Sequence, residues 1–252
     1  MPHAMPVFPR GVPPEASSLR FAHRYLPAAT LGGDFFDVLQ LSDTQCGVVV
    51  SDVMGHGVRA GLLTALIRGV VEEVGFRADS PVAVLAEINR SLAPILRATG
   101  QPVFATVFYG MIDLTAGTLT YANAGHPPAF VLRGATGLAE VLTSGDPEPA
   151  TGLMESFAYT ERRTEFRAGD TLLGYTDGIF EASNKEGAIF GDERLRLLVQ
   201  ANAELPTAQL LDRLIAGVQG FTGRQDFEDD ICVLAVQSTG AVHASAPPNW
   251  EI

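Results

Sequence analysis

The sequence predicts an α+β protein in which largely antiparallel β-sheets carry helices on their faces. Strand-like runs dominate the chain and are interrupted by stretches with helical periodicity. At 113–117 the turn-forming segment DLTAG joins two strand-like runs as a hairpin, which is an antiparallel connection. Apolar residues make up 46% of the 252 residues, enough for the core of one two-sheet domain and too many for a disordered chain.

Strand-like runs start soon after the N-terminus and recur almost to the C-terminus. They are short and rich in the β-branched, aromatic and aliphatic residues that favour sheets. The predicted strands are 19–28, 35–41, 46–52, 103–113, 118–124, 128–133, 159–166, 171–177 and 230–237.

Two helices are predicted between the third and fourth strands. In the segment 58–75 the apolar residues recur at helical spacing, so one face of this helix is expected to pack on a sheet; they are Leu62, Leu63, Leu66, Ile67, Val70, Val71 and Val74. The next helix starts at Ser80 and Pro81, a cap followed by a first-turn proline, and continues toward Leu96. Pro94 is expected to bend or end it. Further helices are predicted at 192–202 and 206–221.

Three segments show no helical or strand period. Residues 1–18, with five prolines, are predicted to be a tail or linker, and 239–252 a C-terminal tail, which leaves 19–238 as the folded domain. The stretch 134–156 is rich in Gly, Thr and Pro and is long for a connection within a compact domain. It is either a mobile loop near a functional site or an ordinary surface excursion.

Charge and cysteine content exclude several classes of protein. The 29 acidic and 17 basic residues give a net charge of −12 and form no basic stripe, so nucleic acid is not an expected partner. No apolar run reaches the roughly 18 residues of a membrane span, and cytoplasm is the expected location. Cys46 and Cys232 lie inside strand-like runs and are expected to be buried, reduced thiols.

Four aspartates lie where predicted strands begin or end: Asp34, Asp52, Asp177 and Asp229. An isolated aspartate before a Gly-rich turn, such as Asp52, is more often a simple cap. Several strand-end acids are different, because sheet ends can bring them to a common edge. Buried carboxylates repel one another and lose hydration, so such a cluster requires protons or cations. The sequence therefore predicts a site for hard divalent cations.

An ordered set of motifs supports a family resemblance. The motifs are GGDFFD, SDVMGHG with the helix that follows, FATVFYGMID, YANAGHPP, GDTLLGYTDGIFEASN, and a pair of aspartates before the last strand. In this order they resemble the PPM-type (PP2C-like), metal-dependent serine/threonine phosphatases. Within that family the chain is similar to the bacterial branch related to SpoIIE and RsbU. The resemblance covers 19–237.

This resemblance implies a four-layer α-β-β-α sandwich, in which helix pairs flank two mostly antiparallel sheets, with two Mg²⁺ or Mn²⁺ ions at one end. By motif, Asp52 would bridge the two ions, Asp177 and Asp229 would complete one of them, and Asp34 would serve the other together with the Val53 carbonyl. Asp52 and Asp177 are the residues assigned to catalysis. A water activated by the paired ions would attack phosphorus without a covalent phosphoenzyme.

Some positions depart from the family pattern or stay ambiguous. The eukaryotic branch carries a histidine two residues after the bridging acid, where this chain has Met54, and His56 is displaced. We expect loop and turn roles for His56 and His126. Asp37 either orients a metal-bound water or caps a strand, and Asp230 is expected to support the site rather than bind metal.

The bacterial branch also suggests partners. The expected substrate is a phosphorylated regulatory protein, such as an anti-sigma-factor antagonist, and the Pro-rich start is compatible with a connection to an N-terminal sensor domain. A homodimer is left open. The alternatives are a hydrolase of small phosphate esters and a non-catalytic binding module, although the latter commonly loses a metal ligand and all four acids are present here.

Overall fold

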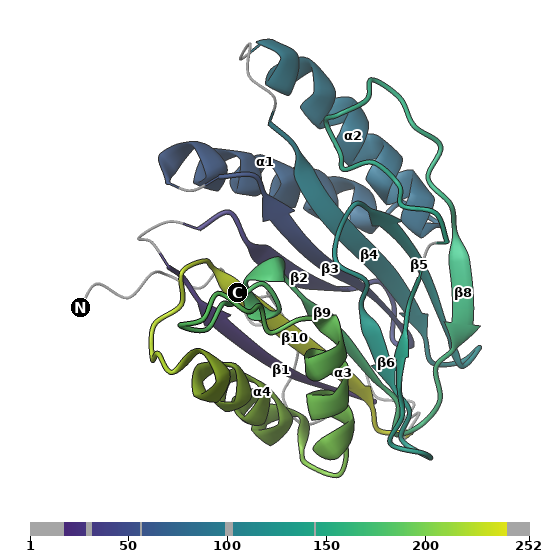
Figure 1. Ribbon diagram of the computed structural model, residues 1–252. Coiled ribbons are helices and arrows are strands. Elements are labelled where there is room, and N and C mark those ends of the chain that lie inside the picture. Colours follow the sequence, from purple (N-terminus) through teal and green to yellow (C-terminus); the bar gives the residue numbers. More distant parts are fainter. Residues whose placement is uncertain (1–17, 29–31, 56, 99–102, 144, 241–252) are drawn as a thin grey trace, which may run out of the picture.

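A computed structural model describes residues 18–28, 32–55, 57–98, 103–143 and 145–240. Two five-stranded sheets lie face to face, and helices cover the outer face of each (Figure 1). Every strand pair is antiparallel. This arrangement confirms the predicted α-β-β-α sandwich.

The two sheets are built from different parts of the chain. Sheet A contains, in spatial order, β1 (Leu19–Leu26), β10 (Ile231–Ser238), β9 (Thr171–Tyr175), β6 (Phe130–Leu132) and β7 (Ala139–Val141). Sheet B contains β2 (Phe35–Gln40), β3 (Gln45–Val53), β4 (Ala105–Asp113), β5 (Thr118–Ala124) and β8 (Arg162–Glu165). Sheet A thus joins the first and last strands of the domain.

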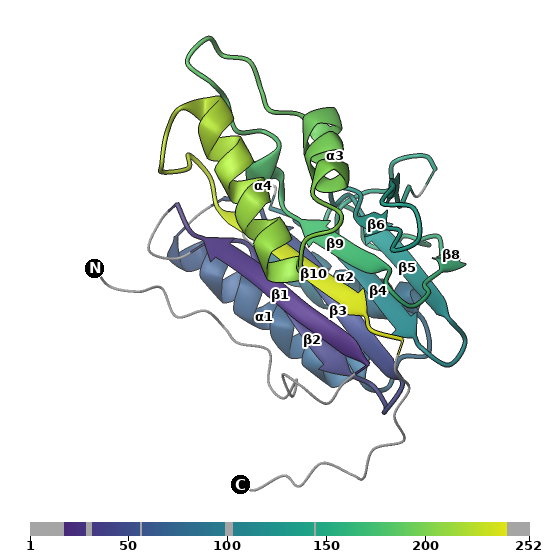
Figure 2. The same cartoon turned by 90° about the horizontal axis from the view of Figure 1, so that it is seen from below.

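Each sheet has its own pair of helices. Helices α1 (Val58–Gly75) and α2 (Pro81–Ala98) contact each other and sheet B, while α4 (Thr207–Thr222) lies on β1 and β10 and α3 (Asp192–Ala201) on β6 and β7. Figure 2 shows the second pair against sheet A, with α1 on the far side of the sandwich. The short 3₁₀ helix η1 (Asp177–Ile179) directly follows Thr176 at the end of β9.

The central strands are covered on both faces, which explains their continuous apolar sequences. In β3, Val48 and Val50 belong to the core between the sheets, whereas Val49 and Val53 belong to the core under α1 and α2. Side chains alternate across a pleated strand, so a strand buried on both faces needs apolar residues at successive positions. Strand β3 is therefore anchored by two cores immediately before the predicted site.

The sequence left open whether helix α2 bends or ends at Pro94. The helix does not end there but continues to Ala98. A proline removes one main-chain hydrogen bond and crowds the preceding turn. Pro94 is exposed, so water can satisfy the carbonyl that loses its partner.

The stretch 134–156 contains more structure than its composition suggested. It includes β7, which pairs with β6 at the edge of sheet A. Further on, Thr151 exchanges main-chain hydrogen bonds of 2.9 and 3.1 Å with Ala105, the first residue of β4, and donates a third from its hydroxyl. Asn89 of α2 accepts a hydrogen bond from Gly152 at 2.8 Å. This part of the stretch is fixed beside the start of β4.

Three further expectations concern the thiols, the membrane and the tails. Cys46 and Cys232 are both buried and form no disulfide, as predicted. Within the described ranges, no helix has the length and apolar character that crossing a bilayer demands. The predicted tails, 1–18 and 239–252, fall almost wholly outside the described residues, so the domain limits remain a prediction.

Candidate active site

Antiparallel pairing brings the predicted acids to one edge of the sandwich. In sheet B, Asp34 precedes β2 and Asp52 lies near the end of β3, and β2 begins where its antiparallel neighbour β3 ends. In sheet A, Asp177 follows β9 and Asp229 precedes β10, and β10 begins where its antiparallel neighbour β9 ends. Each sheet therefore contributes two aspartates, at matching strand ends.

A buried hydroxyl joins the two sheets at this edge. Thr176, which directly precedes Asp177, donates a hydrogen bond of 2.5 Å from Oγ1 to Asp34 Oδ2. The same hydroxyl accepts a hydrogen bond of 2.9 Å from the Cys232 main-chain nitrogen. Thr176 is completely buried. Through this hydroxyl, the Asp34 carboxylate beside sheet B is connected by hydrogen bonds to the ends of β9 and β10 in sheet A.

The electrostatics show that the carboxylates act on one another. Burial raises the pKa of Asp34 well above its usual range and the charge of Asp52 raises it further, while the Thr176 hydrogen bond opposes the rise. Burial, followed by the charge of Asp177, raises the pKa of Asp52 to about 6. The pKa of Asp177 is also raised by burial, and then by Glu181 and Asp229. Burial and neighbouring acids dominate these shifts, so the edge has a deficit of positive charge.

The donor set suits a hard cation. All the candidate ligands supply oxygen, which Mg²⁺ and Mn²⁺ prefer. The glycine at position 33 is also required by this arrangement. A Cβ there would lie 2.4 Å from the Val53 carbonyl oxygen and 3.4 Å from Asp52 Oδ1. Only glycine allows the chain before Asp34 to approach that carbonyl so closely.

The ligands do not form a closed cage. Over the residues that the structure describes, no three His, Cys, Asp or Glu side chains are already arranged to hold an ion. Asp229 is exposed at the rim, and its Oδ1 accepts a hydrogen bond of 2.8 Å from the Asp230 main-chain nitrogen. Like charges without a cation between them repel, so a bound ion would have to draw these carboxylates together. Chemically, the residues fit the expected metal.

Asp230 has a different role from its neighbour. Its two carboxylate oxygens accept main-chain hydrogen bonds of 2.8 Å from Ala28 and 3.0 Å from Gly33. A Cβ at Gly32 would lie 2.1 Å from Asp230 Oδ2, so the chain passes very close to this carboxylate. Asp230 thus shapes the segment that carries Asp34, and its supporting role at the metal site stays a prediction.

Asp37 faces helix α1. Its Oδ1 accepts a hydrogen bond of 2.8 Å from the Val38 main-chain nitrogen, and its Oδ2 lies 3.3 Å from Arg68 Nε. Burial raises the pKa of Asp37, and the hydrogen bond and the arginine oppose that rise. This carboxylate connects β2 to α1.

His126 is buried between the sheets. Its Nδ1 lies 2.8 Å from Thr106 Oγ1, and its Nε2 lies 3.1 Å from the Tyr175 carbonyl oxygen. Burial lowers the pKa of His126 to about 3, against a smaller opposite effect of the bond to Tyr175. The imidazole is therefore neutral at ordinary pH. His56 lies outside the described residues.

Sequence reasoning found the acids but missed two hydroxyls that contact the site. Thr176 and Thr106 were read only as strand residues. The one available signal was the position of Thr176 next to Asp177 in TLLGYTD. Nothing in the sequence indicated that Thr106 pairs in register with Asp52.

A cavity of about 200 Å³ borders this edge. It lies between the segment after β9 and the loop before β10, and Gly178 and Asp229 are among its lining residues. Ser183, Arg224 and Phe227 contribute further walls.

Comparison with known proteins assigns the chain to a family. The sequence model described as Stage II sporulation protein E (SpoIIE) matches residues 42–239. That is most of the 252 residues, so the chain belongs to the SpoIIE family. The recognition made from the motifs is confirmed.

Characterised relatives are longer than this chain. Protein IcfG of Synechocystis sp. (strain ATCC 27184 / PCC 6803 / Kazusa) is 29% identical over 234 residues, which cover 83% of this chain and 36% of IcfG. The phosphoserine phosphatase RsbP of Bacillus subtilis (strain 168) is 25% identical over 213 residues, covering 84% of this chain and 50% of RsbP. The chain thus spans between about a third and a half of these relatives.

Solved structures confirm the fold. The RsbU and RsbW domains of Rv1364c from Mycobacterium tuberculosis align with a TM-score of 0.71 and 26% identity, covering 88% of this chain and 60% of that one. The SiaA-PP2C domain of Pseudomonas aeruginosa aligns with a TM-score of 0.74 and 23% identity, covering 86% and 85%. The architecture is that of the PP2C phosphatase domain.

Proposed function

We propose that this domain hydrolyses phosphoserine or phosphothreonine on a regulatory protein, by means of a water activated by two divalent cations. The observation that carries the proposal is the gathering of Asp34, Asp52, Asp177 and Asp229 at matching strand ends, where burial and mutual repulsion raise the pKa of three of them. Family membership supports the same conclusion. So does RsbP, a relative whose name is phosphoserine phosphatase.

The metal assignment rests on the oxygen-only donor set and on structures of the same fold. RsbX was solved in complex with magnesium, and the catalytic domain of PstP with two manganese ions, at TM-scores of 0.63 and 0.62 to this chain. In this chain the residues that would hold the ions are Asp52, Asp177, Asp229, Asp34 and the carbonyl of Val53. When bound, the ions would supply Lewis acidity, which lowers the pKa of water and offsets charge on the phosphoryl group.

The chain's own groups would prepare the site. Thr176 donates a hydrogen bond to Asp34 and so favours its ionised, ligating form. Asp230 holds the segment before Asp34 through two main-chain hydrogen bonds. Neither cysteine is suited to covalent catalysis, because both are completely or nearly completely buried and burial raises the pKa of each thiol.

The biological setting is part of the proposal. From the bacterial branch that the motifs resemble, we propose a cytoplasmic enzyme whose substrate is a phosphorylated anti-sigma-factor antagonist. The relatives extend well beyond the aligned region, which leaves room for a sensor domain linked to this one. A homodimer is the assembly to test first, because two-fold dimers are the commonest oligomers.

The test is phosphate release from a phosphoserine-containing protein in Mn²⁺, in Mg²⁺ and in chelator. We expect turnover with either metal, none in chelator, and almost none for Asp177→Ala. A matched control is Asp43→Asn, which removes an exposed acid from the β2–β3 turn at the other end of sheet B. Full activity in chelator would refute the metal mechanism.

The same assay separates the alternatives. A hydrolase of small esters would release phosphate from free phosphoserine faster than from the phosphoprotein. A binding module would bind the phosphoprotein without releasing phosphate under any metal condition. Preference for the phosphoprotein supports the proposed substrate class.

A further inference from the structure

We propose that His126 is a positioning residue for the metal site, holding the end of β9 that leads into Asp177 against the strand pair that carries Asp52. The inference rests on the proposed function, because it concerns the same carboxylates. It adds a residue that binds neither metal nor substrate. Its effect is on the distance between the acids of sheet A and those of sheet B.

The placement of His126 supports this role. It follows β5 and is 6% exposed. On one side it contacts Thr106 of β4, which pairs directly with Asp52 and whose Oγ1 also approaches the Asp52 carbonyl oxygen at 3.5 Å. On the other side it contacts the carbonyl of Tyr175, the last residue of β9. One imidazole thus joins the strand ends of both sheets, close to two predicted ligands.

The hydrogen-bond pattern defines the tautomer. A carbonyl oxygen can only accept, so Nε2 must carry the proton that is donated to Tyr175. Since the neutral ring has a single N–H, Nδ1 accepts from the Thr106 hydroxyl. The bridge from Thr106 through His126 to Tyr175 therefore has a fixed direction, and an alkyl side chain cannot reproduce it.

His126 is itself held rigidly. Asn123 binds its main chain twice, by accepting from the His126 nitrogen at 2.7 Å and donating to the His126 oxygen at 2.8 Å. The intervening Gly125 has a φ of +68°, and a Cβ there would lie 2.9 Å from the Ala150 nitrogen. The turn that presents the imidazole is consequently specified by its own residues.

The last residue of β9 and the residue that follows it are therefore both attached to sheet B. Tyr175 is attached through His126 and Thr106, and Thr176 is attached through Asp34. Of these two links, removal of the imidazole leaves the second, and that link ends on a predicted ligand. We expect the metal site to loosen, because groups that orient ligands typically contribute about 10–100-fold to metal affinity.

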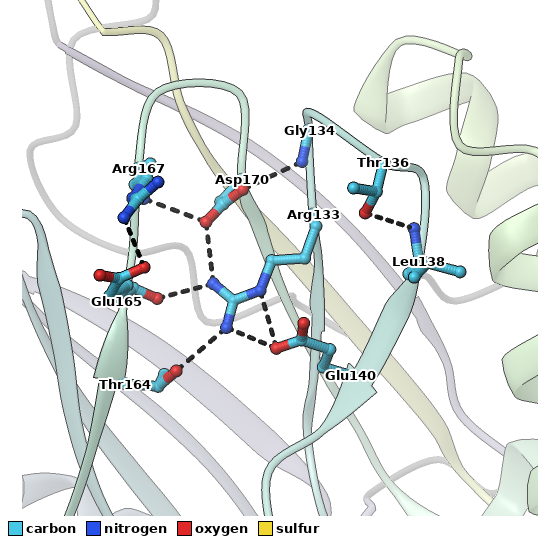
Figure 3. A network of polar contacts seen from close by, with 9 residues as sticks. All are labelled: Arg133, Gly134, Thr136, Leu138, Glu140, Thr164, Glu165, Arg167 and Asp170. Atoms are coloured by element: carbon cyan, nitrogen blue, oxygen red, sulfur yellow. Dashed lines mark hydrogen bonds and ion pairs between the residues drawn. The ribbon is translucent and has the colours of Figure 1, made fainter.

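The opposite end of β9 provides a matched control. There Arg133, at the end of β6, donates to Asp170 Oδ2 at 2.9 Å, to the Glu165 carbonyl at 2.7 Å and to Thr164 Oγ1 at 3.0 Å. Figure 3 shows this network, which also connects the two sheets. Asp170 precedes β9, whereas Asp177 follows it. The network therefore lies away from the acid edge, which is the edge of the sandwich that carries Asp34, Asp52, Asp177 and Asp229.

The experiment compares Mn²⁺ binding by calorimetry in the parent, His126→Leu, His126→Gln and Arg133→Met, together with melting temperature and phosphate release. We expect His126→Leu to bind Mn²⁺ about tenfold or more weakly. His126→Gln, whose amide can still donate toward Tyr175, should recover part of the loss. Arg133→Met should lower the melting temperature yet bind Mn²⁺ within about twofold of the parent.

Each outcome decides the question. Equal affinity in His126→Leu and the parent overturns the inference, as does an equal loss in Arg133→Met at a similar melting temperature, which would mean general loosening. If His126→Leu does not fold, Thr106→Val removes the other half of the bridge, and unchanged affinity there also overturns it. A parent that binds Mn²⁺ but releases no phosphate refutes the proposed function alone. A parent that binds no Mn²⁺ refutes both.

Discussion

The two ends of β9 use buried charge in opposite ways. At its start, the Asp170 carboxylate is nearly buried, but Arg133 and the main-chain nitrogens of Gly134 and Arg167 all donate to it. At its end, the pKa values of Asp177 and Asp52 are raised because both are partly buried and lie close to other acids. The first end compensates its buried charge within the protein.

From this difference we infer that the first end contributes to stability and the second to binding. Charges that are paired and hydrogen-bonded cost little in the folded state, whereas unpaired buried charges destabilise it. Natural proteins retain such local conflicts mainly at functional sites. We propose a cation as the partner of the acids at this end, and four predictions test the contrast.

The largest expected effect comes from Asp52→Asn. Loss of the proposed bridging carboxylate should reduce metal-dependent phosphate release by more than about 100-fold, which exceeds the usual effect of changing an outer group. The same variant should melt at a higher temperature than the parent in chelator at pH 7.5, because one partly buried negative charge among other acids is removed. Calorimetric scanning measures the second effect, and a lower melting temperature would contradict it.

Next, Arg133→Met should destabilise the domain by about 2–3 kcal/mol, because it leaves Asp170 without its guanidinium partner. Urea unfolding, followed by circular dichroism, gives the free energy. Arg163→Met is the control: this arginine is exposed on β8, and its removal should change stability by less than about 0.5 kcal/mol. Similar losses in both variants would mean that the network has no special role.

Bound Mn²⁺ should raise the free energy of unfolding of the parent by about as much as Arg133→Met lowers it. At a free Mn²⁺ concentration of about 100 times the dissociation constant, linkage predicts about 2.7 kcal/mol. Thermal melts with and without metal, at matched ionic strength, measure this gain. Asp52→Asn should show little of it. If Mn²⁺ leaves the melting temperature of the parent unchanged, these aspartates do not bind Mn²⁺.

The smallest effect concerns pH. His126 titrates near 6.5 when unfolded, but its folded pKa is about 3, so the unfolded chain binds the extra proton between these values. The contribution of neutral His126 to the free energy of unfolding is complete above pH 6.5. It is lost as the pH falls below that value, by about 1.4 kcal/mol per pH unit. Urea unfolding of metal-free parent and His126→Gln at pH 5.0–7.5 isolates this slope. Parallel curves for the two proteins would contradict it.

Much of the fold was readable from local patterns. The strand β3 and the helix 58–75 were predicted correctly, because burial on one or two faces leaves a direct pattern in the sequence. Within the predicted apolar face of that helix Leu62 was wrong, because it is 67% exposed, whereas Leu63 and Ile67 are buried. Of the two outcomes expected at Pro94, a bend or an end of the helix, the end was wrong, since the pattern around Pro94 could not show that this turn faces water. Strand β7 was missed because three residues are too few for a period.

The sequence by itself determined which chemistry is available: oxygen ligands at strand ends, in the motif order of a phosphatase family, on a strongly acidic chain. Only the tertiary structure decided which groups support those acids. The sequence did not connect Thr176, Thr106 or His126 with the acids, because their hydrogen-bond partners are far from them along the chain. Contacts of this kind depend on how two sheets are stacked, and local periodicity contains no information about that stacking.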